Sequence, residues 1–152
     1  MDDAVARSLA KWPNVPAVFG WLSLDRRGQW RIKGERIANR ALNEFIGRNY
    51  DRDAKGRWFF QNGPQRVYVS LAYTPLVIRV DEERLVDQCG RPFSPAESFV
   101  DDEGSMLMTG SGTVALLDDR DLARYADGAE ELPRINRAEV AAKFGFVPDP
   151  AP

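Results

Sequence analysis

DRRGQW (residues 25–30) returns 28 positions later as DAKGRW (residues 53–58), and this repeated stretch decides how the chain folds. An Asp followed three residues later by a Gly is typical of a type I turn in which Gly takes the left-handed position. The same spacing occurs again at residues 87–90 and 101–104. Apolar and polar residues alternate in the flanking segments, as they do in strands. The repeat therefore predicts tight turns between paired strands, and it places the tryptophan that ends each stretch in the core.

A further hairpin is indicated by GRWFFQNGPQRVYVSL (residues 56–71). Its Asn-Gly pair at 62–63 separates two strand-like runs, which is a strong hairpin signal. The Pro64 that follows predicts a loop slightly longer than two residues. The apolar runs at residues 75–80 and 112–117 are typical of further strands.

Helices are fewer than strands. Residues 35–48 place their apolar side chains at helical spacing and predict an amphipathic helix after the first hairpin. The aspartates at 118–119 are candidate caps for a helix over residues 120–126, and Asn136 is one for a helix over residues 137–144. We therefore predict an α+β fold, with a mostly antiparallel sheet built of hairpins and with helices near the C-terminus.

The chain of 152 residues suits one domain spanning residues 1–152, because no stretch is long enough to act as a linker. The tail, about residues 148–152, is expected to be frayed. Apolar runs such as PAVFGWL are too short to cross a bilayer, and the opening stretch has no apolar h-region. One cysteine fits a reducing compartment. We therefore expect a cytoplasmic protein that has no membrane partner.

The net charge of −2 conceals two halves of opposite sign. Residues 1–80 carry 14 Lys and Arg against 7 Asp and Glu, whereas residues 81–152 carry 7 against 16. A basic surface of this kind can bind an anionic partner. The alternatives are that the two halves neutralise each other inside one molecule, or that they pair between two molecules in a head-to-tail homodimer.

The absence of histidine excludes several chemistries. Without His there is no Ser-His or Cys-His nucleophile pair and no imidazole metal ligand, and a single Cys cannot form a thiolate zinc site. No metal or cofactor is predicted. Any catalysis would rest on other groups, carboxylates such as Asp118 and Asp121 among them. The thiol of Cys89 is expected to be structural, because no base is available to activate it.

Strand alternation groups aromatic and basic residues on the sheet face opposite the core. Aromatic rings interleaved with Arg and Lys are typical of proteins that stack single-stranded bases and hold phosphates. The face would instead be buried if the acidic half covered it. The candidate binding residues are Trp21, Arg31, Lys33, Arg57, Phe59, Arg66 and Tyr68.

The segment KWPNVPAVFGWL (residues 11–22) is rich in Trp and Pro. It is interpreted as a cover for the core or as a groove for a partner, since Trp is favoured at interfaces. The favoured function is a non-enzymatic binding or accessory protein that contacts a protein partner through its Trp- and Arg-rich N-terminal half. The alternatives are a single-stranded nucleic-acid binder that uses the basic-aromatic face and a small carboxylate-dependent enzyme.

Residues 11–34, together with FIGRNY (residues 45–50) and residues 56–71, resemble a family of small, uncharacterised proteobacterial proteins. The resemblance covers residues 11–80 closely and the remainder loosely. It implies a cytosolic bacterial protein, and it offers no catalytic residue to carry over.

Overall fold

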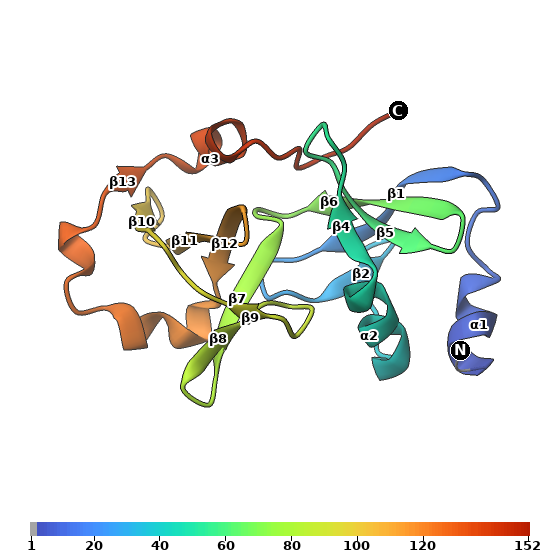
Figure 1. Cartoon of the computed structure of the whole chain (residues 1–152), viewed down its shortest axis with the longest axis horizontal. Helices are drawn as coiled ribbons and strands as arrows, with labels where there is room; N and C mark the ends of the chain where they lie inside the picture. Colours follow the sequence, from blue (N-terminus) through green and yellow to red (C-terminus); the bar gives the residue numbers. More distant parts are fainter. Residues whose placement is uncertain (1–2) are drawn as a thin grey trace.

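The chain forms two β-sheets joined side by side, with helices at the edges (Figure 1). The computed structural model describes residues 3–152, and Met1 and Asp2 of the predicted domain lie outside the described residues. One hydrophobic cluster extends through both sheets. The α+β class predicted from the sequence is confirmed.

The first sheet has six strands in the order β3-β2-β1-β6-β5-β4. Two helices belong to this half of the chain, α1 (Asp3–Leu9) and α2 (Arg40–Arg48). Its strands are β1 (Ala17–Leu24), β2 (Trp30–Ile32), β3 (Glu35–Arg36), β4 (Tyr50–Arg52), β5 (Trp58–Asn62) and β6 (Gln65–Leu71).

The second sheet has seven strands in the order β13-β10-β11-β12-β7-β8-β9. Its strands are β7 (Leu76–Asp81), β8 (Arg84–Val86), β9 (Pro92–Phe93), β10 (Ser98–Asp101), β11 (Met106–Gly110), β12 (Thr113–Leu117) and β13 (Arg134–Ile135). The helices of this half are the 3₁₀ helices η1 (Asp119–Tyr125) and η2 (Ala129–Glu131) and the α-helix α3 (Arg137–Phe144).

Both sheets are mixed, which refines the prediction of a mostly antiparallel sheet. The hairpins are antiparallel as expected, but β1 pairs with β6, β12 with β7 and β10 with β13 in parallel. A parallel pair needs a long connection, so its partners lie far apart in the sequence; Val18 is opposite Val67, for example. Hairpin turns leave a local signal in the sequence, whereas these pairings leave none.

The four Asp-x-x-Gly segments form the same turn. In each, the Gly N–H donates to the carbonyl of the Asp, and the Asp N–H donates to the carbonyl four residues on. One carboxylate oxygen of the Asp accepts two backbone N–H groups at 2.8 to 3.1 Å. The prediction of turns between strands is confirmed, and Trp30 and Trp58 are buried just past their turns.

The hairpin between β5 and β6 has a two-residue loop, because Asn62 is paired with Gln65. The prediction of a longer loop was wrong. Gly63 has a φ of +55°, and Pro64 occupies the second position, where its fixed φ fits a type II′ turn.

The amphipathic helix α2 is shorter than predicted. It begins at Arg40, and Asn39 caps it by accepting the N–H of Leu42. Residues 35–36 instead form strand β3, because Lys33 has a φ of +51° and the following glycine also has a positive φ, which turns the chain back along β2. The predicted capped helix over residues 137–144 is confirmed.

Residues 147–151, here called the C-terminal strap, return from α3 to the first sheet (Figure 1). The Val147 N–H donates to the carbonyl of Gly56 at 2.9 Å, and the Leu71 N–H donates to that of Pro148 at 2.7 Å. The tail predicted to be frayed is therefore hydrogen-bonded, because it supplies partners for backbone groups just before β5 and at the end of β6.

Candidate functional site

Four of the predicted binding residues lie together, Arg57 in the turn before β5, Phe59 on β5, and Arg66 and Tyr68 on β6. Phe59 is directly opposite Tyr68 in the sheet. The guanidinium of Arg57 lies 4.7 Å from the centre of the Tyr68 ring, and that of Arg66 lies 4.2 Å from the Phe59 ring. Phe19 stacks on Tyr68 at 4.7 Å. Each of the two central rings is only 5% exposed, which leaves little ring surface for stacking a base.

The other three predicted residues form a separate group on β1 and at the β2 hairpin. The Lys33 ammonium lies 4.9 Å from the centre of the Trp21 ring. Arg31 forms an ion pair with Asp25 at 2.9 Å and donates to the carbonyl of Gly34. The seven predicted residues thus form two separate groups. In both groups the basic side chains lie against aromatic rings or carboxylates of the same chain.

The C-terminal strap covers part of the predicted face. The guanidinium of Arg57 donates to the carbonyl of Ala151 at 3.2 Å, and the Ser70 hydroxyl donates to Asp149 at 3.3 Å. The strap, which belongs to the acidic half, therefore contacts the face.

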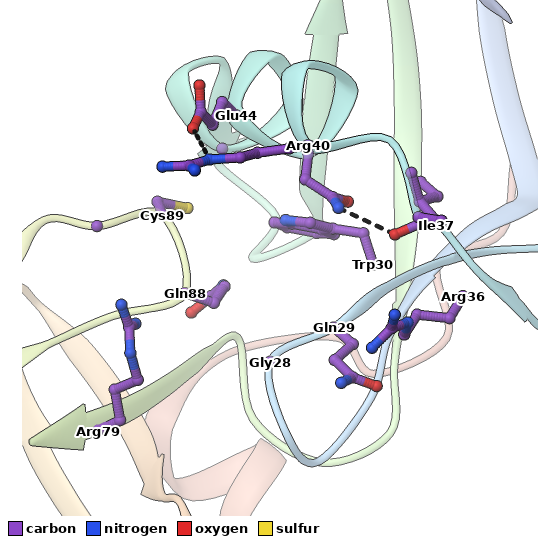
Figure 2. Close-up of a pocket in the computed structure, with 14 residues that line it drawn as sticks. Gly28, Gln29, Trp30, Arg36, Ile37, Arg40, Glu44, Arg79, Gln88 and Cys89 are labelled. Atoms are coloured by element: carbon purple, nitrogen blue, oxygen red, sulfur yellow. Dashed lines mark hydrogen bonds and ion pairs between the residues drawn. The ribbon is translucent and has the colours of Figure 1, made fainter.

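A pocket lies elsewhere, at the junction of the two sheets (Figure 2). Its volume of about 440 Å³ is in the range of sites for small molecules. Its walls come from the first turn, from β3 and α2, and from β7 and the turn after β8. The lining residues used below are Gln29, Arg36, Arg40, Asn43, Glu44 and Arg79.

Three arginines and one carboxylate line the pocket, so its wall carries an excess of two positive charges. Arg40 forms an ion pair with Glu44 at 2.9 Å, but both side chains are largely exposed. Arg36 has no ion-pair partner among residues 3–152. Arg79 makes a long hydrogen bond of 3.5 Å to the carbonyl of Asp87. Two of the three guanidinium groups are therefore without a paired carboxylate.

Neutral amides complete the polar lining. Gln88 belongs to the framework, because it donates to the carbonyl of Pro75 and accepts the Val77 N–H, both at 2.9 Å. The amide of Gln29 makes no side-chain hydrogen bond within the described chain. The Nδ2 of Asn43 donates to the carbonyl of Ile37 at 2.9 Å, whereas its Oδ1 is buried and accepts no hydrogen bond.

One wall of the pocket is a direct contact between the two halves of the chain. A Cβ on Gly47 would come within 3.3 Å of the Cα of Cys89, so α2 rests directly on the turn after β8. Burial, together with the negative charge of Asp87, raises the pKa of the Cys89 thiol to about 12. The thiol is therefore protonated at neutral pH and forms part of the wall, in accord with the structural role expected for it.

The carboxylates considered for catalysis serve the fold. Asp118 caps η1 and binds Arg120 at 2.7 Å, and this side-chain hydrogen bond is the main cause of its lowered pKa. Asp121 accepts the N–H of Val80 at 2.9 Å. Across residues 3–152, no group of three or more acidic or Cys side chains is arranged to hold a metal ion.

The sequence did not single out the pocket. Arg36 and Arg40 both fall within the helix predicted over residues 35–48, whereas the structure places Arg36 on β3 and Arg40 at the start of α2. Arg79 did leave a signal, because it is a single charge in the otherwise apolar run of residues 75–80. What the sequence could not show is that β7 and α2 line the same pocket.

Over residues 1–151, the sequence matches the family described as "Protein of unknown function (DUF2946)". The chain belongs to this family. The resemblance to an uncharacterised family is thereby confirmed. A search of curated proteins gave no match.

Two solved structures share the fold of this family member. A DUF1285 family protein from Shewanella baltica OS155 has a TM-score of 0.54 at 13% identity, covering 70% of this chain and 90% of the other. One from Silicibacter pomeroyi DSS-3 has a TM-score of 0.52 at 16% identity, covering 84% of each chain. At these identities the likeness concerns the fold alone.

No helix within residues 3–152 combines the length and the apolar character that crossing a membrane requires.

Proposed function

We propose that the protein is a non-enzymatic binding protein that holds a small anionic molecule in the pocket between its two sheets. The observation that carries the proposal is the convergence of three arginines from three different elements on one pocket with a single carboxylate. Figure 2 shows Arg36, Arg40 and Arg79 around the same hollow.

Arginine suits this role for physical reasons. Its planar guanidinium donates two parallel hydrogen bonds to a carboxylate or phosphate, and it stays charged at any physiological pH. The three guanidinium groups are exposed, so water screens the repulsion between them, and a bound anion would lower that repulsion further. A ligand bound there would supply the negative charge.

The test is anion binding by calorimetry and by thermal shift, with inorganic phosphate and succinate as the first probes. The double variant Arg36→Ala with Arg79→Ala should weaken binding at least tenfold. The control is Arg7→Ala with Arg84→Ala, which removes the same charge from exposed positions outside the pocket. Equal loss in both double variants, or no binding by the native protein, would contradict the proposal.

A protein partner remains the second candidate, favoured by a separate groove. Residues 9–10, 12–16 and 62–65 line a groove with a volume of about 760 Å³, and most of these residues are apolar. Val15, at its rim, is 47% exposed, and Gln65 holds the segment by donating to the carbonyls of Pro13 and Val15 at 2.6 and 2.8 Å. Exposed apolar patches of this kind mark protein contacts.

The groove is tested by crosslinking from position 15 in a host lysate, with position 84 as the control site. A protein captured only from position 15, and lost in a chain carrying Val15→Asp, would support the partner. If nuclease treatment of the lysate removes the crosslinked product, the nucleic-acid alternative is favoured instead.

A further inference from the structure

The arginines of the proposed ligand site come from both sheets, and their placement indicates the shape of the ligand as well as its charge. Arg36 belongs to β3 of the first sheet, and Arg79 belongs to β7 of the second. Arg40, which begins α2, is the arginine already paired with a carboxylate, that of Glu44. The two arginines that lack a paired carboxylate thus approach from different sheets (Figure 2).

Neutral polar side chains also line the pocket. Asn43 lies on α2, one turn after Arg40, and lines the pocket. Because its Nδ2 is fixed on the carbonyl of Ile37, the atom left without a partner is the acceptor Oδ1. The Oδ1 has almost no accessible surface, so it reaches a ligand hydroxyl or N–H only when the Asn43 side chain turns toward the pocket. Because a buried acceptor without a donor is unfavourable, that hydrogen bond would be stabilising. The free amide of Gln29 offers a second polar contact.

We infer that the ligand is a short dianion of the hydroxy-dicarboxylate type, and this inference rests on the proposed anion-binding function. Its two charged groups are bound by arginines from the two sheets, and its linker donates a hydrogen bond to Asn43. An excess of two positive charges on the wall matches two negative charges on the ligand. The volume of about 440 Å³ is ample for such a molecule.

The experiment compares matched probes on the native protein. The ratio of the dissociation constants of butyrate and succinate measures how much the second charge adds to affinity. The ratio for succinate and malate measures how much the hydroxyl adds. Inorganic phosphate tests a single anionic centre. We expect succinate to bind at least tenfold more tightly than butyrate, malate at least threefold more tightly than succinate, and phosphate more weakly than either dicarboxylate.

Single-residue variants test which side chain causes the preference for succinate over butyrate and which causes the preference for malate over succinate. Arg79→Ala should reduce the succinate-to-butyrate ratio to below threefold, and Asn43→Ala should remove the preference for malate while keeping that for succinate. Arg84→Ala, on β8 and outside the pocket, should change neither ratio. A circular dichroism melt of each variant checks that it is folded.

The outcomes separate the inference from the function on which it rests. If phosphate binds as tightly as the dicarboxylates, or if butyrate equals succinate, the pocket binds anions and the two-ended ligand is wrong. If malate equals succinate in the native protein, the hydrogen-bonding linker is wrong. If no probe binds, both the function and the inference fall.

Discussion

Two turns of this chain share the pattern Asp-x-x-Gly-Arg, DAKGR at residues 53–57 and DQCGR at residues 87–91. Their backbones are alike, with the same four hydrogen bonds around the Asp. Their arginines behave differently. Comparing them separates what five residues encode from what their surroundings add.

In the first turn the arginine folds back on its own aspartate. The Nε of Arg57 lies 2.8 Å from the Oδ2 of Asp53, and both side chains are largely buried. Burial by itself raises the pKa of Asp53. The hydrogen bonds from Arg57 and Lys55 and the charge of Arg57 outweigh it and lower the pKa below its usual value of 3.8.

In the second turn the arginine leaves its aspartate and crosses to the other sheet. Arg91 donates to the carbonyls of Gly47 and Tyr50 at 3.1 and 3.3 Å, at the C-terminal end of α2, where a cation is favoured. Asp87 is 3% exposed and has no ion pair within the described chain. Burial is the main reason that its pKa is raised. The five residues specify the turn, and the neighbouring element decides what the arginine does.

The largest expected effect comes from placing Ala at the glycine of each turn. Both glycines have a φ near +80°, which costs a residue with a Cβ about 1 kcal/mol. A Cβ on Gly56 would also meet the carbonyl of Gly145 at 2.2 Å, whereas one on Gly90 meets nothing within 4 Å. We expect Gly56→Ala to lower the free energy of unfolding by more than about 3 kcal/mol and Gly90→Ala by about 1 kcal/mol.

Denaturant melts of both variants measure the difference. Equal losses would show that the contact between the first turn and Gly145 adds nothing to the stability of the fold.

Removing the charge of the paired aspartate should have the next largest effect. Asp53→Asn leaves Arg57 without its carboxylate and should cost about 2 kcal/mol at pH 7. Because the pKa of Asp53 is lowered in the folded state, its stabilisation is present above the unfolded pKa and is lost as pH falls through the folded pKa. Melts from pH 7 to pH 2 should therefore show the native protein and the variant converging below about pH 4. A constant gap would contradict the ion pair.

A smaller loss is expected from Arg91→Ala, which removes two hydrogen bonds to carbonyls at the end of α2. The side chain is partly exposed, so we expect about 1 kcal/mol. Hydrogen exchange should show faster opening of α2 than in the native protein. Arg57→Ala serves as the control, because its contacts lie within the first sheet and under the C-terminal strap. Equal changes at α2 in both variants would contradict the cross-sheet role of Arg91.

The smallest effect should have the opposite sign. Asp87→Asn keeps an oxygen for the two backbone N–H groups and removes a buried charge, so we expect a gain of up to about 1 kcal/mol at pH 7. Because the pKa of Asp87 is raised on folding, the native protein loses stability as pH rises from 3.8 through the folded value. The variant should lack this loss, and the two should match near pH 3. A variant less stable at neutral pH would show that the ionised carboxylate is needed.

The comparison also shows which features the sequence could predict. Turns, hairpin faces and the caps at Asp118 and Asn136 were predictable, because each depends on residues within a few positions. The parallel pairing of β1 with β6 and the docking of the Cys89 turn on Gly47 were not, because they join distant segments. The candidate pocket belongs to the second class. Its arginines are visible as residues, but their convergence depends on how the two sheets meet.

The C-terminal strap has a consequence for how the protein is made. The backbone bond from Val147 to Gly56 joins residues 91 positions apart in the chain. At a translation rate of about 5–20 residues per second, the ribosome adds the later residue about 5 to 18 s after the earlier one. Throughout that interval the Gly56 carbonyl, just before β5, and the Leu71 N–H, at the end of β6, lack these partners, and a chaperone or another nascent chain can contact them before the strap arrives.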